Sequence, residues 1–144
     1  MDILNVLEKA TQINSVSGSE NEIRKFISDN VKKYCDELSV DAMGNLIAHK
    51  KGSGKKIMFA AHMDEIGIIV TDIDDKGFVR FSSVGGLNLR NLVNLRVRFA
   101  NGVEGVIGAE EESFKDKPAI SKLYVDLGAA DKKEAEKIVS IGDT

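Results

Sequence analysis

The sequence predicts a mixed fold: an α/β segment with two helices and several strands, followed by a small β-rich, barrel-like domain. Apolar residues recur at helical spacing over residues 2–34. The pattern then changes to alternating and continuous apolar runs, which are typical of strands. After residue 67 almost only strand and turn patterns follow. We therefore expect one domain over residues 1–67 and a second over residues 68–144.

Two amphipathic helices are predicted to open the chain. The first covers residues 2–13 and places its apolar side chains on one face. The second is predicted to begin at a capping box formed by Ser19 and Glu22. Its apolar face continues through Tyr34, and the helix should end near Cys35.

Three strands are expected next. Residues 38–40 alternate in polarity, the segment 41–44 is a turn, and residues 45–49 form a second strand. Residues 56–61 are a continuous apolar run, as expected for a strand buried on both faces.

The β-rich part is predicted from repeated strand and turn signals. The expected strands are residues 66–73, 78–84, 95–99, 103–107 and 123–127. Asn101-Gly102 is the strongest hairpin signal, because both residues accept positive φ at low cost. Residues 109–118 are expected to form a loop, and residues 131–138 a helix capped by Asp131. Residues 139–141 look like the start of a further strand, which suggests part of a longer protein.

The composition excludes several classes of function. A net charge of -3 gives no electrostatic reason to expect nucleic acid or an anionic membrane as a partner. No apolar run approaches the roughly 20 residues that span a bilayer, and the acidic N-terminus does not resemble a signal peptide. The single cysteine, Cys35, rules out an internal disulfide framework and suits a reducing cytoplasm.

His62 and Asp64 are the best candidates for chemistry. They follow the apolar run at 56–61 and are two positions apart, so in extended backbone they point to the same side. A metal-bound imidazole needs its second nitrogen held by an acceptor, often a carboxylate. The pair is compatible with a metal site, and also with a hydrogen-bonded histidine at the end of a strand.

Other candidates have simpler explanations. His49 precedes two lysines, which disfavour binding of a cation, so it is predicted to be a surface residue. The acidic run at residues 110–112 lies beside lysines and is interpreted as a solvated loop. Ser17 and Ser19 have no nucleophile-elbow context and are interpreted as caps.

Five separated motifs resemble a known family. They are SVSGSENEIRKFI, DAMGNLIAHKKG, MFAAHMDEIGIIV, FSSVGG and LYVDLGAADKKEAEK. In this order they resemble the cobalt- or zinc-dependent aminopeptidases of the tetrahedral type, which include deblocking and glutamyl aminopeptidases and members once labelled endoglucanase M. The likeness covers essentially all 144 residues.

The resemblance implies a hydrolase that removes N-terminal residues from peptides. It implies that residues 1–67 are the first part of an α/β peptidase domain, and that residues 68–144 are an inserted β-rich domain that supports homo-oligomers, often dodecamers. His62 then matches a metal ligand, and Asp64 matches the catalytic-site carboxylate that orients it. Two divalent ions, zinc or cobalt, would polarise the carbonyl, and a glutamate would activate the attacking water.

The resemblance also places the other metal ligands and the general base in sequence that would follow Thr144. We therefore expect this chain alone to have negligible peptidase activity, and the run at residues 56–61 to be exposed for want of neighbouring strands. The alternative is a truncated structural or oligomerisation module without catalysis. Glycoside hydrolysis has less support, because the chain has no tryptophan and only 6% aromatic residues.

Overall fold

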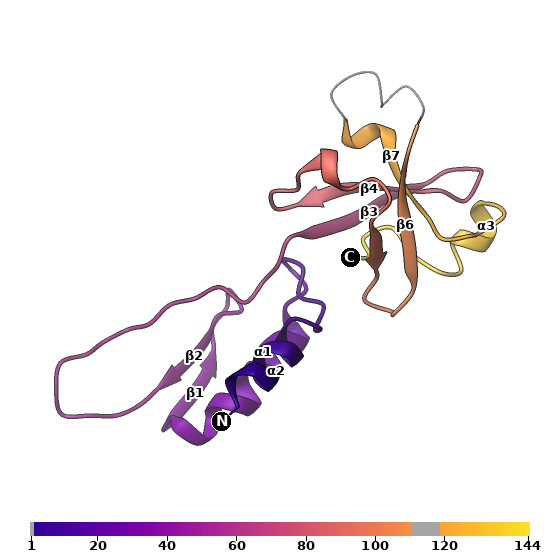
Figure 1. The fold of residues 1–144 in the computed structure, drawn as a ribbon. Helices are drawn as coiled ribbons and strands as arrows, with labels where there is room; N and C mark the ends of the chain where they lie inside the picture. Colours follow the sequence, from indigo (N-terminus) through magenta and orange to yellow (C-terminus); the bar gives the residue numbers. More distant parts are fainter. Residues whose placement is uncertain (1, 111–118) are drawn as a thin grey trace. The chain divides into compact units, whose positions relative to one another are not determined.

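The computed structural model describes residues 2–110 and 119–144, which divide into two compact units (Figure 1). Unit 1 is Met1–Glu65 and unit 2 is Ile66–Thr144. No helix in the described parts of the chain is long and apolar enough to cross a membrane.

Unit 1 contains two helices and a two-stranded antiparallel sheet. Its elements are α1 (Ile3–Ala10), α2 (Asn21–Val31), the 3-10 turn η1 (Lys32–Tyr34), β1 (Glu37–Val40) and β2 (Leu46–His49). The two predicted helices and the first two predicted strands are confirmed. The turn between β1 and β2 depends on Gly44, which has a φ of +85°, and on the Asp41 carboxylate, which accepts from the amides of Met43 and Asn45.

The predicted capping box of the second helix is wrong. The N-cap of α2 is Glu20, and its side chain makes no capping bond. The Glu20 carboxylate instead accepts from the Gly18 amide at 2.6 Å, within the turn that precedes the helix.

The predicted strand at residues 56–61 is also wrong. These residues have no regular secondary structure, and Ile57, Met58 and Phe59 are 78, 87 and 93% exposed. A strand exists only when a neighbour accepts and donates its backbone hydrogen bonds, and the sheets formed by the described residues leave this segment unpaired. The expected exposure of the apolar run is confirmed.

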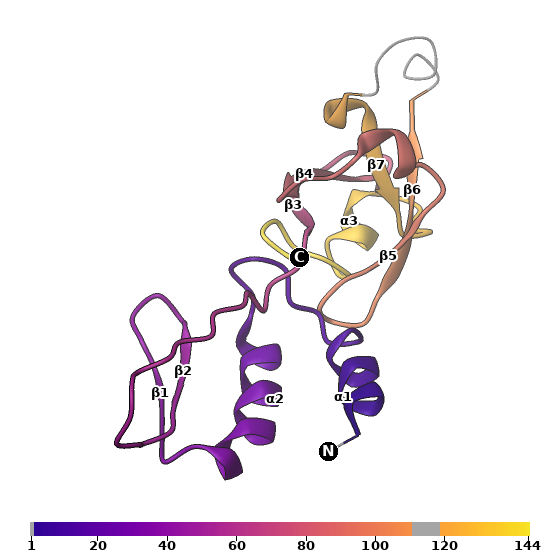
Figure 2. The ribbon, with the colours of Figure 1, turned by 60° about the vertical axis from the view of Figure 1, so that its left-hand side comes forward.

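Unit 2 is built on one five-stranded antiparallel sheet with the order β3-β4-β7-β6-β5 (Figures 1 and 2). The strands are β3 (Gly67–Ile73), β4 (Val79–Val84), β5 (Arg96–Arg98), β6 (Glu104–Ala109) and β7 (Leu123–Asp126). The other elements among the described residues of the unit are the 3-10 turns η2 (Leu89–Asn91) and η4 (Ile120–Lys122) and the short helix α3 (Lys132–Ala135). All five predicted strands are confirmed, whereas the predicted helix at 131–138 is shorter than expected.

The core of unit 2 joins the sheet to α3 and the turn after it. Val79, Leu123 and Val125 from the strands are fully buried. Ala135 of α3 and Val139 belong to the same cluster. The predicted cap of α3 is confirmed, because the Asp131 carboxylate accepts from the amide of Glu134.

The hairpin between β5 and β6 forms as predicted, but with only one residue at positive φ. Gly102 has a φ of +86°, and its amide donates to the Phe99 carbonyl at 2.8 Å. The Phe99 amide donates to the Val103 carbonyl, which closes a three-residue loop that ends in a left-handed glycine.

Gly77 is expected to tolerate alanine less well than Gly102 does. Both glycines have positive φ, which costs alanine about 1 kcal/mol. A Cβ at Gly77 would also lie 2.9 Å from the Asp131 carbonyl oxygen, whereas a Cβ at Gly102 would meet no atom within 4 Å. Urea denaturation should therefore show a larger loss of stability for Gly77→Ala than for Gly102→Ala. Equal losses would contradict the close approach.

The C-terminal segment does not continue as the predicted strand at 139–141. It turns, and its backbone then forms hydrogen bonds near both edges of the five-stranded sheet. The Gly142 amide donates to the Val70 carbonyl, and the Val70 amide donates to the Asp143 carbonyl, both at 2.9 Å. The Thr144 carbonyl accepts from the Ala100 amide, beyond the end of β5. This segment therefore contacts the edge strand β3 and the turn that follows the opposite edge strand.

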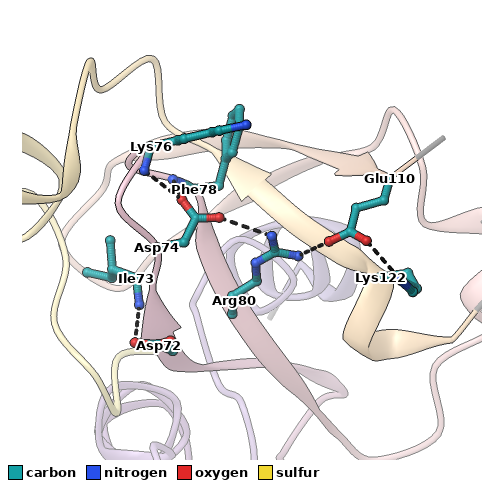
Figure 3. A network of polar contacts seen from close by, with 8 residues as sticks. All are labelled: Asp72, Ile73, Asp74, Lys76, Phe78, Arg80, Glu110 and Lys122. Atoms are coloured by element: carbon teal, nitrogen blue, oxygen red, sulfur yellow. Dashed lines mark hydrogen bonds and ion pairs between the residues drawn. The ribbon is translucent and has the colours of Figure 1, made fainter. Parts of the chain in front are cut away.

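A charged network connects three parts of unit 2 (Figure 3). The Arg80 guanidinium on β4 donates to the carboxylates of Asp74 and Glu110, each at 3.0 Å. Lys122 donates to the other oxygen of Glu110 at 3.1 Å. Glu110 is therefore ion-paired rather than simply solvated as predicted. The rest of the acidic run, Glu111 and Glu112, lies outside the described residues.

Acidification is expected to weaken unit 2 in part through Glu110. Hydrogen bonds from Lys122 and then Arg80 hold the pKa of the Glu110 carboxyl below its ordinary value of 4.5. A lowered pKa stabilises the fold above the unfolded-state value, and this contribution is lost as the pH falls through the folded-state value. By calorimetry, Glu110→Gln should lower the unfolding temperature at neutral pH and reduce its further fall below pH 4.5. An unchanged acid dependence would contradict this role.

Candidate metal centre

His62 and Asp64 contact each other as predicted. The Nδ1 atom of His62 lies 3.0 Å from Oδ1 of Asp64 and 3.0 Å from the Asp64 backbone carbonyl oxygen. Both oxygens are acceptors when the carboxylate is ionised, so Nδ1 must carry the proton. In the neutral imidazole the remaining nitrogen, Nε2, then has a free lone pair. The imidazole side chain is 85% exposed.

Asp64 is held from its other side by Ser17. The Ser17 hydroxyl donates to Oδ2 of Asp64 at 2.5 Å, so each carboxylate oxygen has its own partner. The Ser17 hydrogen bond is the main cause that lowers the pKa of the Asp64 carboxyl, and the His62 hydrogen bond acts in the same direction. Asp64 therefore remains an acceptor for His62 at neutral pH.

Glu65 connects this pair to the segment that carries Ser17. Its amide donates to the Ser15 carbonyl at 2.9 Å, and its carboxylate accepts from the Ser15 amide at 3.0 Å. Its carbonyl accepts from the Ser17 amide at 3.3 Å. These bonds form a parallel bridge between Val16 and Glu65, and Ser15 and Val16 are only 5 and 6% exposed.

The arrangement fits one ligand of a metal ion together with the group that orients it. A histidine that binds a metal through one ring nitrogen usually donates the N–H of the other to a carboxylate, a backbone carbonyl or water. Three or four protein ligands normally hold one ion. No group of three His, Cys, Asp or Glu side chains suited to a metal ion occurs within residues 2–110 and 119–144.

His49 is a surface residue, as predicted. His49 lies on β2, its side chain is 55% exposed, and its Nδ1 is 3.3 Å from a carboxylate oxygen of Glu37. It is a surface residue on a two-stranded sheet.

Sequence reasoning gave Ser17 a different role and assigned no role to Glu65, although Glu65 belongs to the motif MFAAHMDEIGIIV. The interpretation of Ser17 as a helix cap is wrong, because its hydroxyl bonds to Asp64 and α2 begins after Glu20. Ser17 and Asp64 are 47 positions apart, so no local spacing rule could join them. The one available signal was that Glu65 directly follows a histidine and carboxylate pair.

Curated proteins match the sequence of this chain over most of its length. A "Putative aminopeptidase" of Acetivibrio thermocellus is 54% identical over 99% of the chain and 43% of its own length. Lysyl aminopeptidase of Pyrococcus furiosus is 36% identical over 92% of the chain and 42% of its own length. The chain therefore spans about two fifths of the length of these curated relatives.

Solved structures give the same result. The Pyrococcus horikoshii TET1 peptidase, which can assemble into a tetrahedron or a large octahedral shell, matches with a TM-score of 0.81 and 38% identity. The match covers 97% of this chain and 44% of that one. A Thermotoga maritima structure described as an endoglucanase matches with a TM-score of 0.84 and 40% identity, over 95% of this chain and 42% of that one.

The family assignment follows from these matches and from a direct match of residues 44–144 to the pattern that defines the family. The matched region includes His62, Asp64 and Glu65, together with all of unit 2. The chain belongs to the M42 glutamyl aminopeptidase family.

Proposed function

We propose that this chain is the N-terminal share of a dinuclear metal-dependent aminopeptidase, and that it contributes His62 as a metal ligand. The observation that carries the proposal is the His62–Asp64 contact, which engages Nδ1 and leaves the exposed ring with Nε2 on its opposite side, in a chain of this family. The relatives named as aminopeptidases support the reaction class. Peptides with a free N-terminus are the proposed substrates.

Within such an enzyme, the residues of this chain would bind a metal ion and orient the side chain that holds it. His62 would present Nε2, Asp64 would fix the tautomer of the ring, and Ser17 would keep Asp64 in place. Two divalent ions, zinc or cobalt, would supply Lewis acidity at the scissile carbonyl and lower the pKa of the attacking water. The remaining ligands and the general base are proposed to lie in sequence that corresponds to the part of the relatives beyond the match with this chain. The 144-residue chain alone should therefore bind little metal and hydrolyse no peptide.

Unit 2 is proposed to be the inserted β-rich domain of the family. It has a core of its own, since the twelve described residues of the main buried cluster all belong to unit 2. The assembly of the Pyrococcus horikoshii TET1 peptidase into closed shells supports a homo-oligomer for the whole protein, with a dodecamer as the proposed form. The cytoplasm is its proposed location, in agreement with a single free cysteine.

A chimera tests the proposal directly. Residues 1–144 of this chain would replace the aligned 43% of the Acetivibrio thermocellus relative. The chimera should release the chromophore from aminoacyl p-nitroanilides, lose this activity with a chelator and regain it with zinc or cobalt. The matched controls are the unmodified relative and the 144-residue chain alone. A folded, metal-loaded chimera without peptidase activity would contradict the proposal.

Glycoside hydrolysis is the second candidate, because one structural neighbour is described as an endoglucanase. The same chimera and the unmodified relative would be assayed on carboxymethyl cellulose. Release of reducing sugar by the chimera, without peptidase activity, would favour this candidate over the first.

A further inference from the structure

We propose that Ser17 is a positioning residue that acts through Asp64 on His62, and that Glu65 holds Ser17 in the place this requires. The functional meaning of this arrangement rests on the proposed role of His62 as a metal ligand. The geometry itself is complete within unit 1 and needs no metal ion.

The first step is the division of the Asp64 carboxylate between two partners. Oδ1 faces Nδ1 of His62 at 3.0 Å, and Oδ2 receives the Ser17 hydroxyl at 2.5 Å. The terminal torsion of an aspartate has broad minima, so one hydrogen bond alone leaves the carboxylate free to swing. A second partner on the opposite oxygen fixes the plane in which the carboxylate meets the imidazole.

The second step is solvent competition. The side chain of Asp64 is 37% exposed and that of His62 is 85% exposed, so water can replace either partner of an unsupported pair. A hydrogen bond to an ionised carboxylate is stronger than one between neutral groups. The Ser17 contact is of this kind, and it occupies the oxygen that water would otherwise use to turn the carboxylate away.

The third step is the anchoring of Ser17 itself. Ser17 follows the buried residues Ser15 and Val16, whose backbone runs parallel to Glu65. The Glu65 carboxylate accepts from the Ser15 amide, and the Glu65 main chain bonds to Ser15 and Ser17. Because Glu65 directly follows Asp64, this bridge sets the Ser17 hydroxyl against the Asp64 carboxylate. The Glu65 side chain therefore has a structural task at the site rather than a chemical one.

The experiment measures the tautomer of His62 in the metal-free 144-residue chain. The chain has two histidines, and His49→Gln removes the second signal. In this background, the ring nitrogen chemical shifts of ¹⁵N-labelled protein report which nitrogen carries the proton at a pH where the imidazole is neutral. The starting protein should show the Nδ1–H form. Asp64→Ala should lose it and give the reference state without an orienting carboxylate.

Matched pairs of variants then separate the effect of the Ser17 hydroxyl from the effect of side-chain shape. Thr and Val have the same shape, so Ser17→Thr should keep the Nδ1–H signature and Ser17→Val should move it toward the Asp64→Ala reference. Glu65→Gln keeps an oxygen that accepts from the Ser15 amide and should behave as the starting protein. Glu65→Ala should move in the same direction as Ser17→Val. The backbone amide spectrum of each variant checks that unit 1 remains folded.

The outcomes are distinct from those of the proposed function. Equal signatures for Ser17→Thr and Ser17→Val would overturn the role of the hydroxyl, and equal signatures for Glu65→Gln and Glu65→Ala would overturn the anchoring role of Glu65. An inactive chimera would contradict the proposed role of His62 in a peptidase, but the measurements on its ring nitrogens would be unaffected.

Discussion

Replacing His62 by alanine is expected to lower the peptidase activity of the chimera by more than about 100-fold. Loss of a group that only orients a metal ligand costs about 10- to 100-fold in metal affinity or activity, and loss of the ligand itself should cost more. His62 is the one histidine of this chain whose ring is oriented by a carboxylate two positions away. Turnover of an aminoacyl p-nitroanilide and bound metal per subunit are the two measurements.

His49→Ala is the matched control for this substitution. It removes the same side chain from an exposed position on β2, where Nδ1 lies 3.3 Å from a carboxylate oxygen of Glu37. Its activity and metal content should equal those of the unsubstituted chimera. Full activity in His62→Ala would exclude His62 from the metal site. An equal loss in both variants would indicate damage to the fold of unit 1 instead.

Truncating Leu123 to alanine is expected to destabilise unit 2 by about 2–5 kcal/mol. Leu123 begins β7, which lies between β4 and β6 in the sheet, and its side chain is fully buried. Removing three carbon atoms there leaves a cavity that the surrounding strands can fill only in part. Urea denaturation followed by the amide signals of β6 and β7 would measure the change.

Leu95→Ala is the control for the core substitution. Leu95 is 49% exposed in the same unit, so the same truncation removes less buried area and should cost about 1 kcal/mol or less. If the two variants lose equal stability, β7 is not at the centre of the core. The amide signals of unit 1 should be unchanged in both variants.

The parts of the fold that were predictable depend on local chemistry. The hairpin at Asn101-Gly102 and the turn before β2 are determined by residues within four positions of one another. The irregular backbone of residues 56–61 was not predictable from their apolar run, because the run indicates that a strand would need neighbours and does not show whether they are present. The boundary and domain roles assigned to residues 1–67 and 68–144 stay predictions.

The same distinction applies to the candidate metal centre. The contact between His62 and Asp64 was predictable, since it joins positions two apart. Ser17 was not, because it reaches Asp64 only after the chain has folded back on itself. Local spacing therefore placed His62 and Asp64 on the same side of the chain, and the family resemblance gave them their proposed roles at the metal. Long-range structure was needed to find the residues that support them.

The hydrogen bonds of the C-terminal segment have a consequence for the order of folding. Val70 on β3 bonds to Gly142 and Asp143, although nearly all of unit 2 lies between them in the chain. Contacts between residues so far apart raise the contact order and slow folding. During synthesis, β3 is among the first parts of unit 2 to leave the ribosome, but its outer edge stays open until residues 142–143 follow. An open strand edge is a template for pairing with another chain, so the interval before these residues arrive is when unit 2 is most exposed to misassembly.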